Sequence, residues 1–96
     1  MSVTLTEALD WLRVDSGAND GIVLALLDAA PAYVEAATGL DAESQQGEPY
    51  VDLCDTATKF LLTLWYYGES GNVNQVSGVV DSLLKSISTL KVGGGD

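Results

Sequence analysis

Apolar positions recur at helical spacing in four segments of the chain, and no segment alternates as a strand would. The first segment, residues 4–14, places Leu5, Leu9 and Leu12 on one face. It opens with Thr4 and Glu7, which have the spacing of a capping box. The pattern predicts a short helix with one buried side.

The second segment, residues 21–38, predicts a long helix that Asp20 caps and Gly39 ends. Pro31 lies inside its apolar stripe, lacks an amide donor and clashes with the preceding turn. We therefore expect a bend or break near residues 27–30, with two shorter helices as the alternative. The predicted stripe comprises Val23, Leu26, Leu27, Ala30, Val34 and Ala37.

Two further helices are predicted after a polar, exposed loop at residues 40–50. Residues 51–67 form one helix, which Gly68 ends, and residues 77–90 form the other. The inward positions are Leu53, Ala57, Phe60, Leu61 and Leu64 in the first, and Val79, Val80, Leu83, Leu84, Ile87 and Leu90 in the second. The sequence thus predicts an all-α bundle of about four helices with a long second helix, in a domain of residues 1–91 followed by a flexible glycine-rich tail at 92–96.

Composition indicates one small domain with an apolar surplus. The chain has 96 residues, of which 47% are hydrophobic and 19% are charged. That balance is more apolar than a monomer of this size needs, so we expect a partner or an oligomer.

The charge is strongly negative, at −10 from 14 acidic and four basic residues. A phosphate backbone would be repelled, so direct binding of nucleic acid is not expected. There is no basic residue between Arg13 and Lys59, and we expect one side of the fold to be strongly acidic. The acids in that interval are Asp15, Asp20, Asp28, Glu35, Asp41, Glu43, Glu48, Asp52 and Asp55.

The residues offer little for catalysis or metal binding. There is no His, and Cys54 stands between acids that oppose a thiolate, so a structural thiol is favoured. Residues 15–21 resemble a calcium loop, but the register puts Ala18 and Leu27 at ligand positions. We expect no enzymatic activity, no cofactor and no metal.

Neither a secretion signal nor a membrane span is expected from the sequence. The first residues have no basic segment before an apolar core, and the longest apolar runs are far shorter than a span. A single Cys also allows no disulfide within the chain, which fits a reducing cytoplasm.

Three consecutive aromatic residues, Trp65, Tyr66 and Tyr67, spread around a helix and cannot all enter one core. We expect Trp65 and one Tyr to complete the core, with the remainder available for a subunit contact, where such residues are enriched. The candidate interface residues are Trp65, Tyr66, Tyr67, Val80, Leu84 and Lys91.

The order of these motifs resembles the head–tail connector family of tailed phages, also called adaptor or DNA-packaging proteins. A short helix ends in Leu12-Arg13-Val14-Asp15, an acid opens a long helix, and the helix closes with Ala32, Tyr33, Val34, Thr38 and Gly39. Residues 57–70 and 76–88 resemble the family's later helices, so the resemblance covers residues 4–88. The chain departs from the family pattern at Pro31, at residues 68–70 after the aromatic pair, and at Ser77.

The resemblance implies a non-enzymatic structural protein of the virion neck, assembled in the cytoplasm of the bacterial host. Its partners would be copies of itself in a ring, typically a dodecamer, together with the portal protein and the next neck or tail-completion protein. DNA would pass through the channel without specific binding. An acidic inner surface fits that role, because like charge removes the counterion release that makes basic surfaces bind DNA.

The alternative is an acidic helical regulator, such as an antitoxin or a DNA mimic, that occupies a basic partner protein. Oligomeric state separates the two hypotheses, because a regulator should be a monomer or dimer. A connector should instead form rings, or remain a monomer until it meets its portal.

Overall fold

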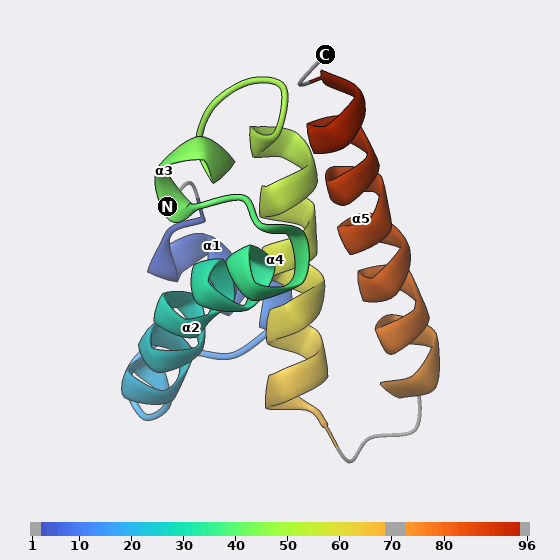
Figure 1. The fold of residues 1–96 in the computed structure, drawn as a ribbon. Coiled ribbons are helices and arrows are strands. Elements are labelled where there is room, and N and C mark those ends of the chain that lie inside the picture. The colour runs from blue at the N-terminus through green and yellow to red at the C-terminus, as the bar shows by residue number, and fades with distance from the viewer. Residues whose placement is uncertain (1–2, 69–72, 95–96) are drawn as a thin grey trace.

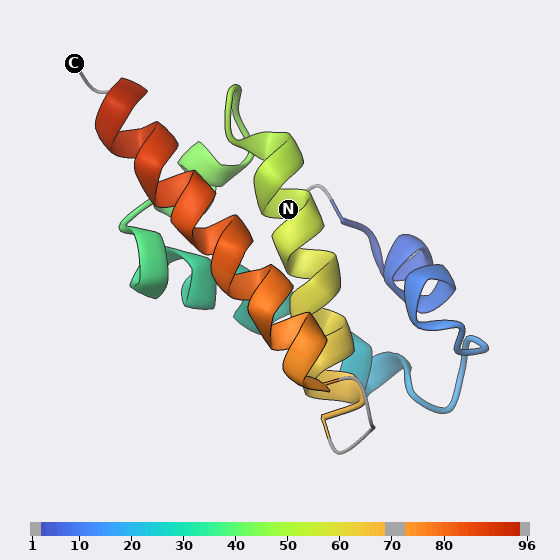
Figure 2. The same ribbon diagram turned by 90° about the vertical axis from the view of Figure 1, so that its right-hand side faces the viewer.

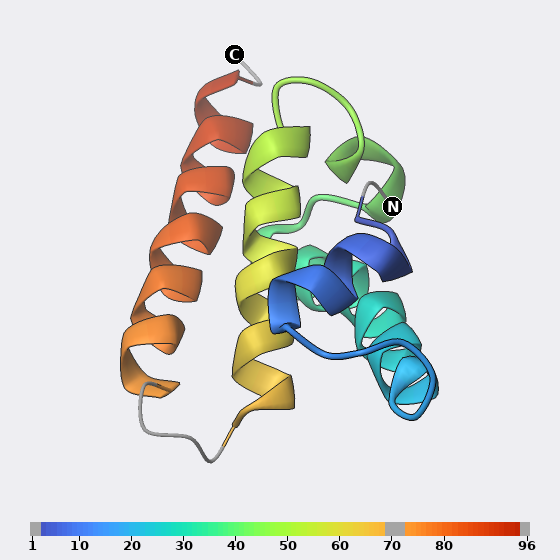
Figure 3. The same ribbon diagram turned by 180° about the vertical axis from the view of Figure 1, so that it is seen from behind.

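The computed structural model describes residues 3–68 and 73–94, and every element in these ranges is a helix (Figure 1). The helices are α1 (Leu5–Leu12), α2 (Asp20–Thr38), α3 (Ala42–Gln45), α4 (Val51–Tyr66) and α5 (Val73–Gly94). α4 lies at the centre, with α5 along one side and α1 and α2 on the other (Figures 1 and 3). The prediction of a small all-α bundle with a long second helix is confirmed, with one additional short helix.

α1 begins and ends as its residues dictate. The Thr4 hydroxyl accepts a hydrogen bond from the Glu7 amide at 3.2 Å, and the Glu7 carboxylate accepts one from the Thr4 amide at 3.1 Å. These bonds lower the pKa of Glu7. Arg13 then ends the helix in the left-handed conformation, at φ 60°. The predicted capping box is confirmed.

α2 is a continuous helix through Pro31, so the predicted break into two helices does not occur, while a bend at this position stays a prediction. Tertiary packing outweighs the lost hydrogen bond, because Ala30 and Val34 on either side of Pro31 are buried. Asp20 is the first helical residue and not the predicted N-cap, since Asn19 holds that position. The Asp20 carboxylate instead accepts from the Gly17 amide at 2.8 Å and closes the turn. Gly39 ends α2 at φ 78°, as predicted.

The segment predicted as an exposed loop contains α3 and two buried residues, Leu40 and Gln45. The Asp41 carboxylate caps α3 by accepting from the Ser44 amide at 2.8 Å, and this bond lowers the pKa of Asp41. The Gln45 side-chain amide donates to the carbonyls of Pro31 at 3.0 Å and Leu40 at 2.8 Å. These bonds fasten α3 to α2, which explains why a polar segment packs inward.

Two clusters of buried side chains meet at α4. Leu61 belongs to the cluster formed with α2 and α5, whereas the next residue, Leu62, belongs to the cluster formed with α1 and α2. α4 is therefore buried on two sides, and the single predicted stripe missed Leu62 and Thr58. Cys54 is buried in the first cluster, as a structural thiol should be.

α5 is longer than predicted at both ends. It begins at Val73, before the predicted start at residue 77, and runs to Gly94, so residues 92–94 of the expected tail are helical. Residues 69–72 and residues 95–96 of the expected tail lie outside the described residues. Val79 was predicted to point inward but is 40% exposed, because Val80, Leu84 and Ile87 form the buried face.

The bundle is thin. Its Cα atoms extend over 46 × 26 × 18 Å, so the shortest direction holds only about two layers of helix. Figure 2 shows α5 lying across α4 with nothing covering its other side. Peripheral helices in such a bundle each keep one face that this chain does not cover.

Candidate assembly interface

Two of the six predicted interface residues lie in the core. Val80 is 1% exposed and Leu84 is 8% exposed, and both belong to the cluster between α2, α4 and α5. In this conformation neither side chain can contact another subunit. Their burial agrees with the inward positions that the apolar spacing predicts for the last helix, and not with a place on an outer surface.

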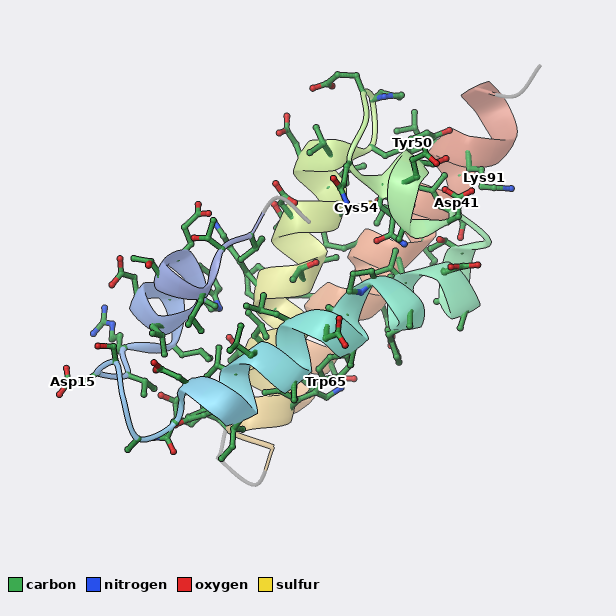
Figure 4. The ribbon with its side chains drawn as sticks, turned by 90° about the vertical axis from the view of Figure 1, so that its left-hand side faces the viewer. Asp15, Asp41, Tyr50, Cys54, Trp65 and Lys91 are labelled. Carbon is green, nitrogen blue, oxygen red and sulfur yellow. The ribbon has the colours of Figure 1, made fainter. Side chains whose placement is uncertain are left out.

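The three consecutive aromatics form contacts within the chain. The Trp65 ring packs edge-on against Tyr33 of α2, with centroids 5.6 Å apart, and Figure 4 shows Trp65 beside α2. Tyr66 packs against the α1 cluster, and Tyr67, 38% exposed, donates its hydroxyl hydrogen to the Leu12 carbonyl at the end of α1. Tyr66 and Tyr67 also meet edge-on at 4.9 Å. These residues join α4 to α1 and α2, and only part of each ring is left for a partner.

Lys91, the last predicted interface residue, belongs to α5 and lies beside the C-terminal end of α2. A Cβ atom placed on Gly39 would be 3.7 Å from the Lys91 Nζ, and Figure 4 shows Lys91 beside Asp41. α2 has no basic residue in its own last turn. The Lys91 ammonium therefore supplies the positive charge that a helix C-terminus favours, which is a role within the chain.

The most exposed apolar surface lies on α2, where the sequence analysis identified only the inner stripe. Its inner face comprises Val23, Leu27, Ala30 and Val34, none more than 6% exposed. The exposed side of α2 carries Asp28 and Glu35 along one edge, and beside them a strip without charge follows the helix. We call this strip the α2 outer strip; it consists of Ile22, Ala25, Ala29, Ala32, Tyr33 and Ala36.

The largest members of the α2 outer strip are Ile22, 57% exposed, and Tyr33, 42% exposed. Asp28 and Glu35 border it on one side together with Leu24, which is 51% exposed. Scattered exposed apolar residues are ordinary, whereas these six residues form one continuous strip over four helical turns.

The signal for this strip was present in the sequence as the scarcity of charge in residues 21–38. Among the described residues, α2 is the one helix long and apolar enough to cross a membrane by length and composition. Its mean hydropathy is 1.3, and only 22% of the 18-residue window with that value is buried. Since α2 also supplies four residues to the core, it is a bundle helix whose apolar surplus lies outside.

A second uncovered surface follows α5. An open groove of about 510 Å³ is lined by Gln75, Gly78, Val79, Ser82, Leu83 and Ser86, which we call the α5 groove. A second hollow of about 410 Å³ shares Ser86 and continues past Thr89 and Leu90. A Cβ atom added at Gly78 would meet nothing within 4 Å, so this surface is open. The groove residues carry no charge, while Lys85 borders them.

Groups for other chemistry are sparse in the part of the chain that the structure describes. No group of three or more His, Cys, Asp or Glu residues there could hold a metal ion. Burial, and secondarily the charge of Asp55, raises the pKa of Cys54 to about 11, so its thiol is protonated at neutral pH. The acids from Asp15 to Asp52 are mostly exposed and lie on or between α2, α3 and the start of α4.

Comparisons with protein-family models, with curated proteins and with solved structures find no match.

Proposed function

We propose that this protein is a structural head–tail connector of a tailed phage or prophage. It would form a ring beneath the portal at the capsid vertex and receive the next neck protein, while DNA passes through the ring. The observation that carries the proposal is the exposed, charge-free α2 outer strip on a thin helical domain. A surface of that kind fits a protein that functions by assembly.

The order of the sequence motifs favours a connector ring over other kinds of assembly. The turn from Leu12 to Asp15, the long helix closed at Gly39, and the helix ending in aromatics are spaced as in the connector family. Arg13 and Gly39 both adopt left-handed backbone at these helix ends, so the turns that carry the resemblance are built from local chain geometry.

The charge is consistent with the same role. A net charge of −10 disfavours adhesion of DNA to a channel wall, because no counterions are released from the DNA by an acidic surface. It is equally consistent with the second hypothesis, an acidic regulator that mimics DNA for a basic partner. The α2 outer strip favours the connector, since a DNA mimic needs an acidic contact surface and this strip has no charge.

The experiment is negative-stain imaging of purified portal rings with and without the protein, supported by co-sedimentation. A connector should add a ring of density beneath the portal and pellet with it. If the protein leaves the portal unchanged, stays a monomer or dimer at all concentrations, and binds a small basic protein instead, the regulator hypothesis replaces the connector.

A further inference from the structure

The two uncovered surfaces of this chain are similar in length. The α2 outer strip runs from residue 22 to 36 and the groove surface of α5 from residue 75 to 89, each about 21 Å at 1.5 Å per residue. The strip presents Ile22 and Tyr33 at its ends with alanines between them. The groove is hollowed at Gly78, Ser82 and Ser86. Small residues on both sides allow two helices to approach closely.

The charges beside the two surfaces differ. Asp28 and Glu35 border the α2 outer strip, and α2 has no basic residue. Lys85 borders the α5 groove, and Lys85 and Asp81 line one hollow together. Pairing α2 with α2 of another copy would bring four acids together, whereas pairing α2 with α5 places the acids of α2 beside a surface that includes Lys85.

One copy can offer both surfaces at once. The strip and the groove share no residue, and Figures 1 and 2 show α5 and the N-terminal half of α2 on opposite sides of α4. A contact between two different surfaces of identical chains is head-to-tail, and it closes into a ring when the rotation between neighbours permits.

We propose that the α2 outer strip of one copy binds the α5 groove of the next copy, head to tail. This inference rests on the proposed function, because it names the two surfaces by which neighbours meet in the ring. A membrane is a poorer occupant of the strip, because a surface-bound helix needs basic residues for anionic lipid and residues 14–58 contain none.

The contact is small. A strip about 21 Å long and about 10 Å wide covers on the order of 200 to 400 Å² per copy, against about 800 Å² per partner in a stable complex. A single pair should therefore dissociate readily in dilute solution. Closure of the ring, or alignment of copies on the portal, would make the contacts mutually supporting.

Chemical cross-linking of mixed copies tests the pairing. One copy carries Ala29→Cys in the strip and the other carries Ser82→Cys in the groove; both positions are exposed, so thermal unfolding should be unchanged. The native Cys54 is 3% exposed and should not compete for the reagent. With a short bismaleimide at high protein concentration, mass spectrometry should find the mixed A29C–S82C product severalfold above either homodimer. The matched control replaces A29C with Thr6→Cys on the exposed part of α1.

The proposal is overturned if A29C–A29C products predominate, or if A29C–S82C forms no faster than T6C–S82C. Repeating the cross-linking reaction on portal rings distinguishes a failure of the proposed pairing from a failure of the proposed connector function. Assembly on the portal without the mixed product refutes the pairing and leaves the connector in place. A predominant mixed product with no attachment to the portal supports the pairing and removes the connector.

Discussion

The two faces of α2 are almost equally apolar, yet the chain covers only one of them. Ala30 is fully buried against α4 and α5, while its neighbour Ala29 is exposed on the α2 outer strip. The inner face stabilises the domain, because apolar area is removed from water when the chain folds. Apart from the edge-on contact of Tyr33 with Trp65, the outer face stays exposed to water, and we infer that its apolar character serves association.

Glutamate substitutions at the adjacent residues Ala29 and Ala30 should differ most in their effect on the free energy of unfolding. Ala30→Glu would bury a carboxylate at a site with no room for it, and should cost about 4 kcal/mol or more. That is a large share of the stability of a domain of this size, so the variant should be mostly unfolded. Ala29→Glu should change the free energy of unfolding by less than about 0.5 kcal/mol. Urea denaturation followed by circular dichroism measures both, and equal losses would show that both faces are covered.

Leucine and isoleucine truncations compare the same faces without adding charge. Leu27→Ala removes a side chain that is 6% exposed, and the cavity should cost about 2 to 5 kcal/mol. Ile22→Ala removes one that is 57% exposed, and should cost less than about 0.5 kcal/mol. Thermal or urea unfolding gives both values. A near-zero result for Leu27→Ala would mean that the buried stripe has been misplaced.

The pH dependence of stability tests the burial of Cys54, which lies in the cluster beneath the inner face of α2. Its pKa is about 11 in the folded chain, above its ordinary value, so the folded state holds the thiol proton more tightly than the unfolded state. The resulting stability is complete below about pH 8 and declines as the pH rises toward 11, on the order of 1 to 2 kcal/mol by pH 10.5. Urea midpoints at pH 8 and pH 10.5 should diverge less in Cys54→Ala, which lacks the thiol. An identical pH dependence in the two proteins would place the thiol in contact with water.

Substitution of Tyr67 measures how much the hydrogen bond between Tyr67 and α1 contributes to stability. Its hydroxyl donates to the Leu12 carbonyl, and Tyr67→Phe keeps the ring while removing that bond. The free energy of unfolding should fall by about 0.5 to 1.5 kcal/mol, which is the smallest effect in this series that denaturation can resolve. Tyr50→Phe is a control that makes the same chemical change at the start of α4. Equal effects of the two substitutions would argue against the bond to α1.

Features that neighbouring residues determine could be predicted from the sequence, whereas features that depend on tertiary packing could not. The capping box of Thr4 and Glu7 and the end of α2 at Gly39 were predicted because neighbouring residues determine them. The position of α3 depends on Gln45 reaching the Pro31 carbonyl, fourteen residues away, so no local pattern could indicate it. The continuity of α2 through Pro31 likewise depends on packing on both sides of the proline.

The directions of single side chains were harder to predict than the helices that carry them. Val79 and Val80 are adjacent and equally apolar, and both were predicted to point inward, but which one is buried depends on how α5 meets α4. Lys91 was predicted only as a candidate interface residue, because its place beside Gly39 depends on how α5 packs against α2. The alanines of the α2 outer strip gave no strong signal individually, because alanine is common on both sides of helices.

Binding to the portal measures the central claim most directly, namely that the outer face of α2 is an assembly surface. Wild-type protein, Ala29→Glu and Thr6→Glu are each sedimented with purified portal rings, and the copies bound per portal are counted. The two variants carry the same added charge at exposed positions. We predict that wild type and Thr6→Glu load many copies per portal while Ala29→Glu loads few. Equal loading of all three proteins would contradict the assignment of the α2 outer strip to assembly.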